Sequence, residues 1–388
     1  MTAGAASDQN TGPVRPAPDP VFETVSFQDL SRWADDDHVA ALAAFVRFCT
    51  PGLVTDQRFL QLPDDVCEAG SALAAANSGD KTADGDAAKA FFEQNFTPYR
   101  FKQAGFVTGY FEPELAAARA PDNQHRYPLL RPPGGLVAVT DANRPHNWPA
   151  ELSHGRMTED GLVPLPDRGA IMDGALRPEN LELVWLRDPV DAFFVHVQGS
   201  ARLRLEDGSV MRVGYAGKTG HPYTSIARVL VDRGEGRPED LTMSGLRRWL
   251  VKNPAGRDAL FRENRSYIFF REVTGARQHD GPIGSAGVPL VAGRSLAVDP
   301  AFVPFALPAF VAGQDLADLD APDREFSRLM MADDSGSAIK GAGRADIFVG
   351  SGVAAGSIAG EIRHTATLTV LVPRGLEDAF AERMRGAE

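Results

Sequence analysis

Residues 331–350 (MADDSGSAIKGAGRADIFVG) bring three aspartates, a lysine and several small residues into one short segment. The glycines allow the backbone to approach a ligand closely, because they carry no Cβ. The apolar triplet 347–349 directly after Asp346 predicts a buried strand beside that carboxyl group. Burial would raise the pKa of Asp346, as a general acid at neutral pH requires. The structural alternative is a turn at Asp-Ser-Gly and a capping role for Asp346.

The overall charge of the chain bears on what it binds. The 388 residues carry 40 basic and 52 acidic side chains, for a formal charge of −12, which argues against nucleic acid as a partner. An uncharged or mixed-charge polymer fits better. No apolar run approaches the roughly 18 residues of a transmembrane helix. The best candidate, residues 39–49, is short and contains Arg47.

Metal and cofactor chemistry has no sequence support. The eight histidines show no spacing such as HExxH, and the two cysteines, Cys49 and Cys67, cannot build a zinc site alone. We therefore expect no metal and no cofactor.

The elements that must position the segment 331–350 are mainly strands. Helical spacing of apolar residues predicts helices up to about residue 100, and short apolar alternations broken by Gly and Pro predict strands beyond it. We expect a loop-rich tract over 121–167 and two helices at 225–233 and 243–251. The expected strands are 181–186, 192–197, 201–213, 288–298, 308–311, 329–332, 346–349 and 365–372. The pattern alone indicates a mainly β protein with a helical N-terminus.

Six segments appear together in the order typical of one family. They are 109–113 (GYFEP), 193–200 (FFVHVQGS), 214–226 (GYAGKTGHPYTSI), 266–270 (SYIFF), 293–300 (GRSLAVDP) and 331–350. With them the chain, over roughly residues 105–372, resembles the membrane-bound lytic transglycosylase A family, with its C-terminal 3D domain. That many collinear matches are more specific than any one short motif.

The resemblance implies a fold and its boundaries. A double-psi β-barrel domain is assembled from both chain ends, and a smaller β-rich domain is inserted into it, with the substrate groove between the two. Mapped here, residues 1–22 are a flexible segment, 23–112 the helical part and start of the barrel, 113–275 the insert, and 276–388 the second barrel half with the catalytic Asp.

The resemblance also implies a reaction. The family cleaves the β-1,4 bond between N-acetylmuramic acid (MurNAc) and N-acetylglucosamine (GlcNAc) in peptidoglycan without water, and forms 1,6-anhydro-MurNAc. One carboxyl group suffices, because it first protonates the leaving oxygen and then deprotonates the C6 hydroxyl that attacks C1. By position Asp346 matches this acid–base residue. Asp334 would hold the loop or the sugar, Asp299 would fix turns by accepting backbone N–H bonds, and Lys340 would contact substrate or loop.

Further side chains of the matched segments are candidates for substrate binding. Tyr110 and Tyr215 could stack on sugars or belong to the core, whereas Phe111 favours the core. Gln198 and Ser200 offer hydrogen bonds to acetamido and hydroxyl groups.

Three positions depart from the family pattern. Ala201 stands for the more usual glycine, Thr219 for asparagine and Arg265 for proline. They bear on the shape of the groove and on affinity, and none of them removes the expected acid.

Two other function classes stay open. A muramidase-type hydrolase would use a second carboxylate, for which Asp333 and Asp334 are the candidates in sequence. A non-catalytic glycan-binding double-psi barrel would keep the fold without the chemistry. The expected partner in each case is peptidoglycan glycan, with no nucleic acid and no transmembrane segment.

The resemblance places the protein in the cell envelope, in the periplasm or outer membrane of a Gram-negative bacterium. Residues 1–22 show neither a basic start nor an apolar core, so no secretory signal and no lipid-acceptor cysteine is visible there. We expect a removed signal or a misassigned start, with the Pro- and Ala-rich opening as a tether. In this setting we predict a Cys49–Cys67 disulfide; two buried free cysteines are the alternative.

Overall fold

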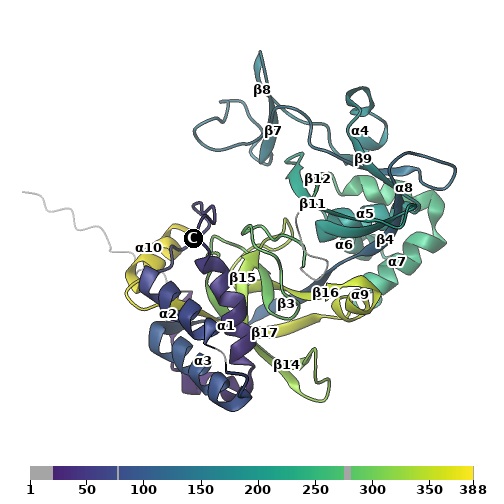
Figure 1. The fold of residues 1–388 in the computed structure, drawn as a ribbon. Coiled ribbons are helices and arrows are strands. Elements are labelled where there is room, and N and C mark those ends of the chain that lie inside the picture. Colours follow the sequence, from purple (N-terminus) through teal and green to yellow (C-terminus); the bar gives the residue numbers. More distant parts are fainter. Residues whose placement is uncertain (1–20, 77, 275–280, 388) are drawn as a thin grey trace, which may run out of the picture.

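The structure is a computed structural model that describes residues 21–76, 78–274 and 281–387. It is mainly β, with helices at both chain ends and along one side (Figure 1). Residues 1–20 of the predicted flexible segment 1–22 lie outside the described residues. Phe22 already begins the first strand, β1.

Three helices form the N-terminal part: α1 (His38–Phe45), α2 (Asp64–Ala75) and α3 (Lys81–Asn95). Carboxylates cap two of them, since Asp37 accepts the Ala40 N–H at 3.0 Å and Asp80 accepts two N–H groups of the first turn of α3. The helices pack through aromatic rings such as Phe45 and Phe92, both fully buried, with ring centroids 6.1 Å apart. The helical N-terminus predicted from sequence is confirmed.

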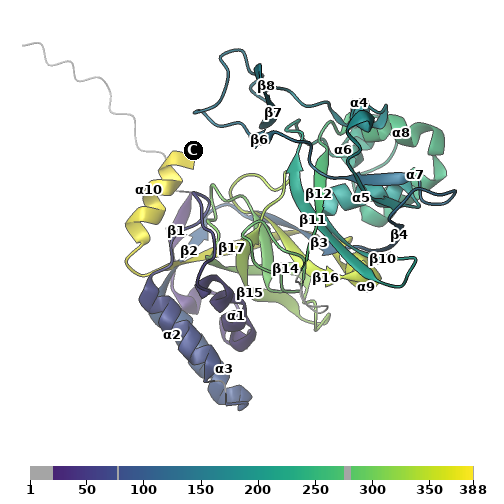
Figure 2. The same ribbon diagram turned by 45° about the horizontal axis from the view of Figure 1, so that its top comes forward.

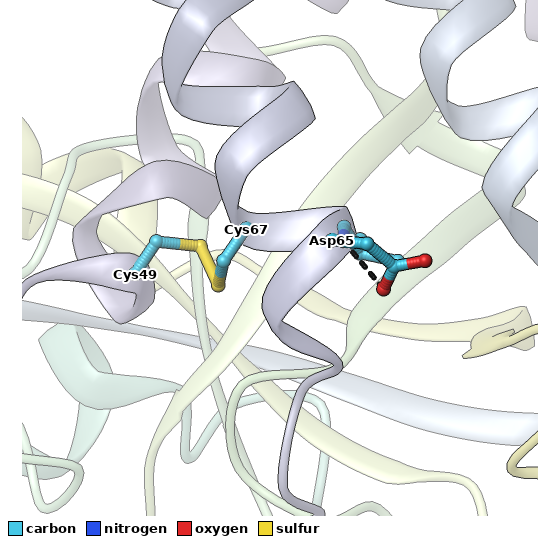
Figure 3. Close-up of a disulfide and its surroundings, with 4 residues drawn as sticks. Cys49, Asp65 and Cys67 are labelled. Carbon is cyan, nitrogen blue, oxygen red and sulfur yellow. Dashed lines mark hydrogen bonds between the residues drawn. A yellow bond between two sulfur atoms is a disulfide. The ribbon is translucent and has the colours of Figure 1, made fainter.

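A disulfide joins Cys49 to Cys67, as predicted (Figure 3). Cys49 ends a 3-10 turn, Val46–Cys49, and Cys67 lies in the first half of α2. The two Cα atoms are 5.2 Å apart and 18 positions separate the residues. The bond therefore fixes α2 to the end of α1.

The larger sheet has eight strands in the order β1-β2-β17-β14-β15-β13-β16-β3. An additional pairing joins β3, at one end of this sheet, to β17, so that the six strands from β17 to β3 close into a ring and β1 and β2 extend from it. Its strands are β1 (Phe22–Thr24), β2 (Phe96–Phe101), β3 (Gly105–Glu112), β13 (Ser295–Val298), β14 (Pro308–Ala317), β15 (Glu325–Asp334), β16 (Arg344–Ser351) and β17 (Arg363–Pro373).

Both chain ends contribute to this ring, β3 from the first third and the other five strands from the last third. Alternating side chains such as Val107, Ile347 and Val370 are fully buried in the core. α9 (Gly352–Ala359) packs against β3 and β16, and α10 (Glu377–Ala387) against β17. The five C-terminal strands overlap the five predicted ones.

A second, open sheet of six strands has the order β12-β11-β10-β4-β9-β5. It lies on the side of the ring opposite the N-terminal helices (Figures 1 and 2). The chain leaves the ring at Pro113, between β3 and β4. The strands are β4 (Glu114–Ala118), β5 (Tyr127–Leu130), β9 (Glu182–Leu186), β10 (Ser200–Leu205), β11 (Val210–Lys218) and β12 (Ile268–Glu272).

Five helices accompany the open sheet. They are α4 (Arg168–Met172), α5 (Pro189–Gln198), α6 (Ile226–Asp232), α7 (Met243–Lys252) and α8 (Pro254–Glu263). The two helices predicted at 225–233 and 243–251 are confirmed as α6 and α7. The expected loop tract 121–167 instead contains β5 and a small three-stranded sheet of β6 (Leu136–Ala138), β7 (His154–Thr158) and β8 (Gly161–Val163).

The strand predicted at 192–197 is wrong, because this segment lies within helix α5. Three flanking residues account for the difference. Asp188 accepts the Val190 N–H at 2.7 Å as the N-cap, Pro189 occupies the first turn, and Gly199 ends the helix at φ 80°. The run of apolar residues is compatible with a buried strand and with a buried helix, so the capping residues determine that a helix forms.

No helix among the described residues is long and apolar enough to cross a membrane.

Candidate active site

Asp346 lies on β16, between β13 and β3, opposite Ala297 on one side and Thr108 on the other. Its Oδ1 accepts a hydrogen bond from Thr108 Oγ1 at 2.7 Å, and the residue is partly exposed. Burial of the carboxyl group raises its pKa to about 6, against the opposing effects of the Thr108 bond and the Arg344 charge. Asp346 is therefore a partly exposed residue whose carboxyl group has a raised pKa.

Asp334 ends β15, and hydrogen bonds hold both of its carboxylate oxygens. Oδ1 accepts the Ser285 N–H at 2.9 Å, the Ser285 hydroxyl at 2.8 Å and the Ser335 N–H at 2.9 Å. Oδ2 accepts the Tyr110 hydroxyl at 2.9 Å. Burial raises the pKa of Asp334, and these bonds oppose that rise. The charge of Asp334 in turn raises the pKa of Asp346, so the two carboxyl groups are electrostatic neighbours.

Tyr110 lies in the core beside the site. It is 8% exposed, and its ring packs on Phe348 with centroids 5.3 Å apart. Burial raises the pKa of its phenol well above the usual value, so the hydroxyl stays a donor to Asp334. Phe111 is half-buried against α9 at Gly356. Of the two roles considered for Tyr110, the position in the core is the one found.

Asp299 lies next to Lys340 of the segment 331–350. Asp299 accepts the backbone N–H of Ala301 at 3.3 Å and of Gly341 at 2.9 Å, the type of bond expected of it. Lys340 Nζ is 3.7 Å from Asp299 Oδ1, and its side chain is 66% exposed. Lys340 is thus a surface side chain next to the turn that Asp299 holds.

Asp333, the alternative second carboxylate, is fully buried. Its Oδ2 is 3.1 Å from Arg47 Nη2 and accepts the Ser295 hydroxyl at 2.5 Å. Burial raises the pKa of Asp333 to about 7, against the opposing charge of Arg47. Because solvent does not reach it, Asp333 cannot activate a water molecule in this conformation.

Two tyrosines from the half that contains the open sheet lie near charged groups of the other half: Tyr215 on β11, and Tyr223 between β11 and α6. Tyr215 on β11 is 46% exposed, and burial of its phenol raises its pKa to about 12, opposed by the charge of Arg58 from the N-terminal part. Burial also raises the pKa of Tyr223, and the Asp346 charge adds to that rise. Both tyrosines thus come within electrostatic range of side chains on the opposite half of the molecule.

Direct contacts also join the two halves. Gln198, at the end of α5, accepts the Phe111 N–H at 3.0 Å. Lys218 Nζ lies 3.4 Å from Ser337 Oγ in the loop that follows Asp334. Ser200 is 7% exposed at the start of β10. Gln198 thus connects the halves through β3, and Ser200 offers little surface to a ligand.

A buried ion cluster at the junction was not predicted. Glu112, at the end of β3, is fully buried and lies 2.8 Å from Arg212 and 3.6 Å from Arg202, both on the open sheet. Ser351 on β16 donates to Glu112 at 2.7 Å. Glu112 belongs to the motif GYFEP and is the last residue before the expected domain boundary. A charged residue at that boundary was the signal in the sequence for a contact between the two domains.

The three departures from the family pattern have defined surroundings. Ala201 and Thr219 are fully buried, and Thr219 Oγ1 accepts the Tyr267 N–H at 3.3 Å. Arg265 is 2.9 Å from His221 Nδ1 and 3.5 Å from Asp167. Ala201 and Thr219 therefore act on packing, and Arg265 adds a polar contact.

Among the described residues, one group of side chains has metal-ligand spacing: Asp122, His125 and Glu206. His125 Nδ1 is 2.8 Å from Asp122, and Nε2 accepts from Arg187 Nε at 2.9 Å. Both ring nitrogens are thus already engaged.

Comparisons with known proteins agree on one family. The chain matches the MltA specific insert domain over residues 106–271 and the 3D domain over 294–372. It is 33% identical over 272 residues to membrane-bound lytic murein transglycosylase A of Escherichia coli K12, an alignment that covers 68% of this chain and 64% of that relative. The chain thus spans slightly less than two thirds of that relative's length.

Solved structures match over more of the chain. The crystal structure of membrane-bound lytic murein transglycosylase from Agrobacterium tumefaciens has a TM-score of 0.81 and 40% identity, and the match covers 92% of this chain and 99% of that one. That of E. coli MltA with bound chitohexaose has a TM-score of 0.64 and 26% identity, with 92% of each chain covered.

Proposed function

The chain belongs to the membrane-bound lytic murein transglycosylase A family, and on this premise we propose that it is a peptidoglycan lytic transglycosylase. Such an enzyme is a carbon–oxygen lyase that cleaves the MurNAc-β-1,4-GlcNAc bond and leaves 1,6-anhydro-MurNAc. The observation that carries the proposal is Asp346, a partly exposed residue on β16 whose carboxyl group has a pKa of about 6 and accepts a hydrogen bond from Thr108.

In the proposed mechanism Asp346 acts twice. It donates its proton to the glycosidic oxygen as the bond from C1 of MurNAc to that oxygen breaks. As a carboxylate it then accepts the proton of the C6 hydroxyl while the C6 oxygen bonds to C1. The proton count is unchanged at the end of the cycle, so neither water nor a cofactor is consumed. E. coli MltA has been crystallised with a chito-oligosaccharide, which supports a glycan as the ligand.

We assign supporting roles to the surrounding residues. Asp334, held by Tyr110 and Ser285, keeps the loop after β15 in place beside Asp346. Asp299 fixes the turn at Gly341, next to Lys340.

On the opposite half, Tyr215 is the exposed aromatic residue suited to stack on a sugar. We propose that Gln198 and the buried Ser200 shape the groove through the junction.

The architecture proposed for this activity is a double-psi barrel with an inserted domain. The ring is evidence for this architecture, because its strands come from residues before and after the open sheet in the sequence. The proposed barrel halves are residues 23–112 and 276–388, and the proposed insert is residues 113–275. The substrate groove would lie between the two domains, where the Asp346 charge acts on Tyr223. Because the relatives are membrane-bound murein enzymes of Gram-negative bacteria, we also propose a location in the cell envelope.

Incubation with purified peptidoglycan, followed by mass analysis of the soluble fragments, tests the proposal. We expect 1,6-anhydro ends. Reducing ends would indicate a muramidase, and binding without release would indicate a glycan-binding module. The burial of Asp333 and the four bonds to Asp334 argue against the hydrolase, which needs a free second carboxylate.

A further inference from the structure

Thr108 on β3 lies between a cation and the Asp346 carboxyl group. Its Oγ1 is 2.7 Å from Asp346 Oδ1 and 2.8 Å from Arg344 Nη2. The strand register places Thr108 directly opposite Asp346 in the parallel pair β3–β16. The contact is therefore built into the backbone of the ring.

While Asp346 is a carboxylate, which can only accept, the number of protons fixes the direction of both hydrogen bonds. Arg344 can only donate, and a threonine hydroxyl has one proton and two acceptor lone pairs. Thr108 therefore accepts from Arg344 and donates its single proton to Asp346 Oδ1. Among the described residues no hydrogen bond reaches Asp346 Oδ2. Because Thr108 already donates to Oδ1 of this carboxylate, a proton that Asp346 takes up goes to Oδ2.

Arg344 is anchored independently of Thr108. Its Nη1 donates to the backbone oxygens of Phe106, at 3.3 Å, and Ala345. The guanidinium carbon lies 5.5 Å from the centre of the Phe106 ring. Removal of the Thr108 hydroxyl would thus leave Arg344 in place.

We propose that Thr108 is a positioning residue that holds Asp346 through Oδ1, so that Oδ2 is the atom that gives and takes the proton, and that Arg344 orients the Thr108 hydroxyl. This inference rests on the proposed function for its catalytic meaning. A carboxyl group pinned at one oxygen cannot rotate freely about its Cβ–Cγ bond. The free oxygen is then aimed at one place, which favours a group that must meet two different substrate oxygens in turn.

The Thr108 bond also affects the titration of Asp346. It favours the carboxylate form, as does the charge of Arg344, while burial and the charge of Asp334 oppose it. The Asp346 charge also acts on Tyr110 from β3 and on Tyr223 from the open-sheet half, and both phenols stay neutral because their pKa values are raised. Loss of the Thr108 hydroxyl should therefore raise the pKa of Asp346.

The test compares Thr108→Val, which keeps the shape and loses the hydroxyl, with Thr108→Ser, which keeps the hydroxyl. For Thr108→Val we expect kcat to fall about 10- to 100-fold with little change in KM, and the alkaline limb of the rate profile to move to higher pH. Thr108→Ser should recover most of both effects. The inference is overturned if Thr108→Val keeps wild-type kcat and pH profile, or if Thr108→Ser is equally impaired.

The pKa of Asp346 can also be measured without the reaction, by carbon NMR of protein labelled at aspartate. The Asp346 signal is assigned by its loss in Asp346→Asn. We expect a higher pKa in folded Thr108→Val than in wild type, and an unchanged pKa would contradict the inference. If wild type yields reducing ends or releases nothing, the proposed function fails, and this titration still decides the role of Thr108. Arg344→Gln should impair turnover less in a Thr108→Val background than alone, and full additivity would remove Arg344 from the account.

Discussion

Asp346 and Asp333 lie on two strands, β16 and β15, that flank the same strand β13, and burial raises the pKa of both. Each accepts a hydrogen bond from a hydroxyl group and has an arginine charge nearby, but the exposure of the two residues differs. Asp333 is fully buried, with its charge opposite Arg47 and its oxygens bound by Ser295 and a backbone N–H. Asp346 is partly exposed and has one oxygen without a partner among the described residues.

The difference shows that a raised pKa alone does not identify the acid. Desolvation raises the pKa wherever a carboxyl group is taken from water, whether it serves packing or chemistry. Access for the substrate and a free oxygen separate the two cases. On these grounds we expect substitution of Asp346 to affect turnover and substitution of Asp333 to affect stability.

The largest expected effect is that of Asp346→Asn. The amide keeps the size of the side chain but can neither give nor take the proton, so the release of fragments should fall by about 10² to 10⁴ while peptidoglycan binding persists. Fragment release and a pull-down with insoluble peptidoglycan measure the two quantities. Asp334→Asn is the matched control and should lose less, because an amide can keep part of its hydrogen bonding. Greater damage from Asp334→Asn would move the assignment to that residue.

The pH dependence of turnover sharpens the comparison. Asp346 must be protonated at the start of the reaction, so the rate should be highest below its pKa of about 6 and should fall about tenfold per pH unit well above it. Initial rates of fragment release between mildly acidic and alkaline pH measure this. A flat profile would mean that another group supplies the proton.

Asp333→Ala should separate stability from chemistry. The substitution leaves the Arg47 guanidinium, 18% exposed, without its carboxylate, and should cost about 3 kcal/mol of unfolding free energy. Turnover per folded molecule should stay near the wild-type value. Urea unfolding and rates corrected for the folded fraction test both statements. A loss of turnover comparable to that of Asp346→Asn would indicate that Asp333 takes part in the reaction.

The smallest effect on turnover is expected at the disulfide, in the N-terminal helices. Replacement of Cys49 and Cys67 by alanine should lower the unfolding free energy by about 2 to 4 kcal/mol, because the open chain gains entropy when unfolded. Activity at low temperature should be unchanged. Equal stability of the variant and the oxidised wild type would show that this bond does not hold α2 in place.

The sequence was most informative where a local pattern carries the information. Asp346 was predicted beside a buried strand, and it lies on β16 with Ile347 fully buried. The disulfide was predicted correctly. The 192–197 segment was assigned wrongly, because its apolar run fits both periods and the decisive caps, Asp188 and Gly199, lie outside it.

What the sequence could not provide are contacts between distant positions. Thr108 and Asp346 are 238 positions apart, and only the strand register brings them together. The Glu112–Arg212 pair, 100 positions apart, likewise depends on where two sheets meet. Tyr110 was considered for sugar stacking because a phenol has a polar end, and its partner turned out to be Asp334, which no spacing rule indicates.

The central claim is that Asp346 alone carries both proton transfers of a cleavage that uses no water. The most direct test is digestion of purified peptidoglycan in water enriched with oxygen-18, with mass analysis of the muramic acid ends. The account predicts 1,6-anhydro ends that contain no oxygen-18, and their loss in Asp346→Asn. Reducing ends labelled with oxygen-18 would contradict it, because they require water to attack C1.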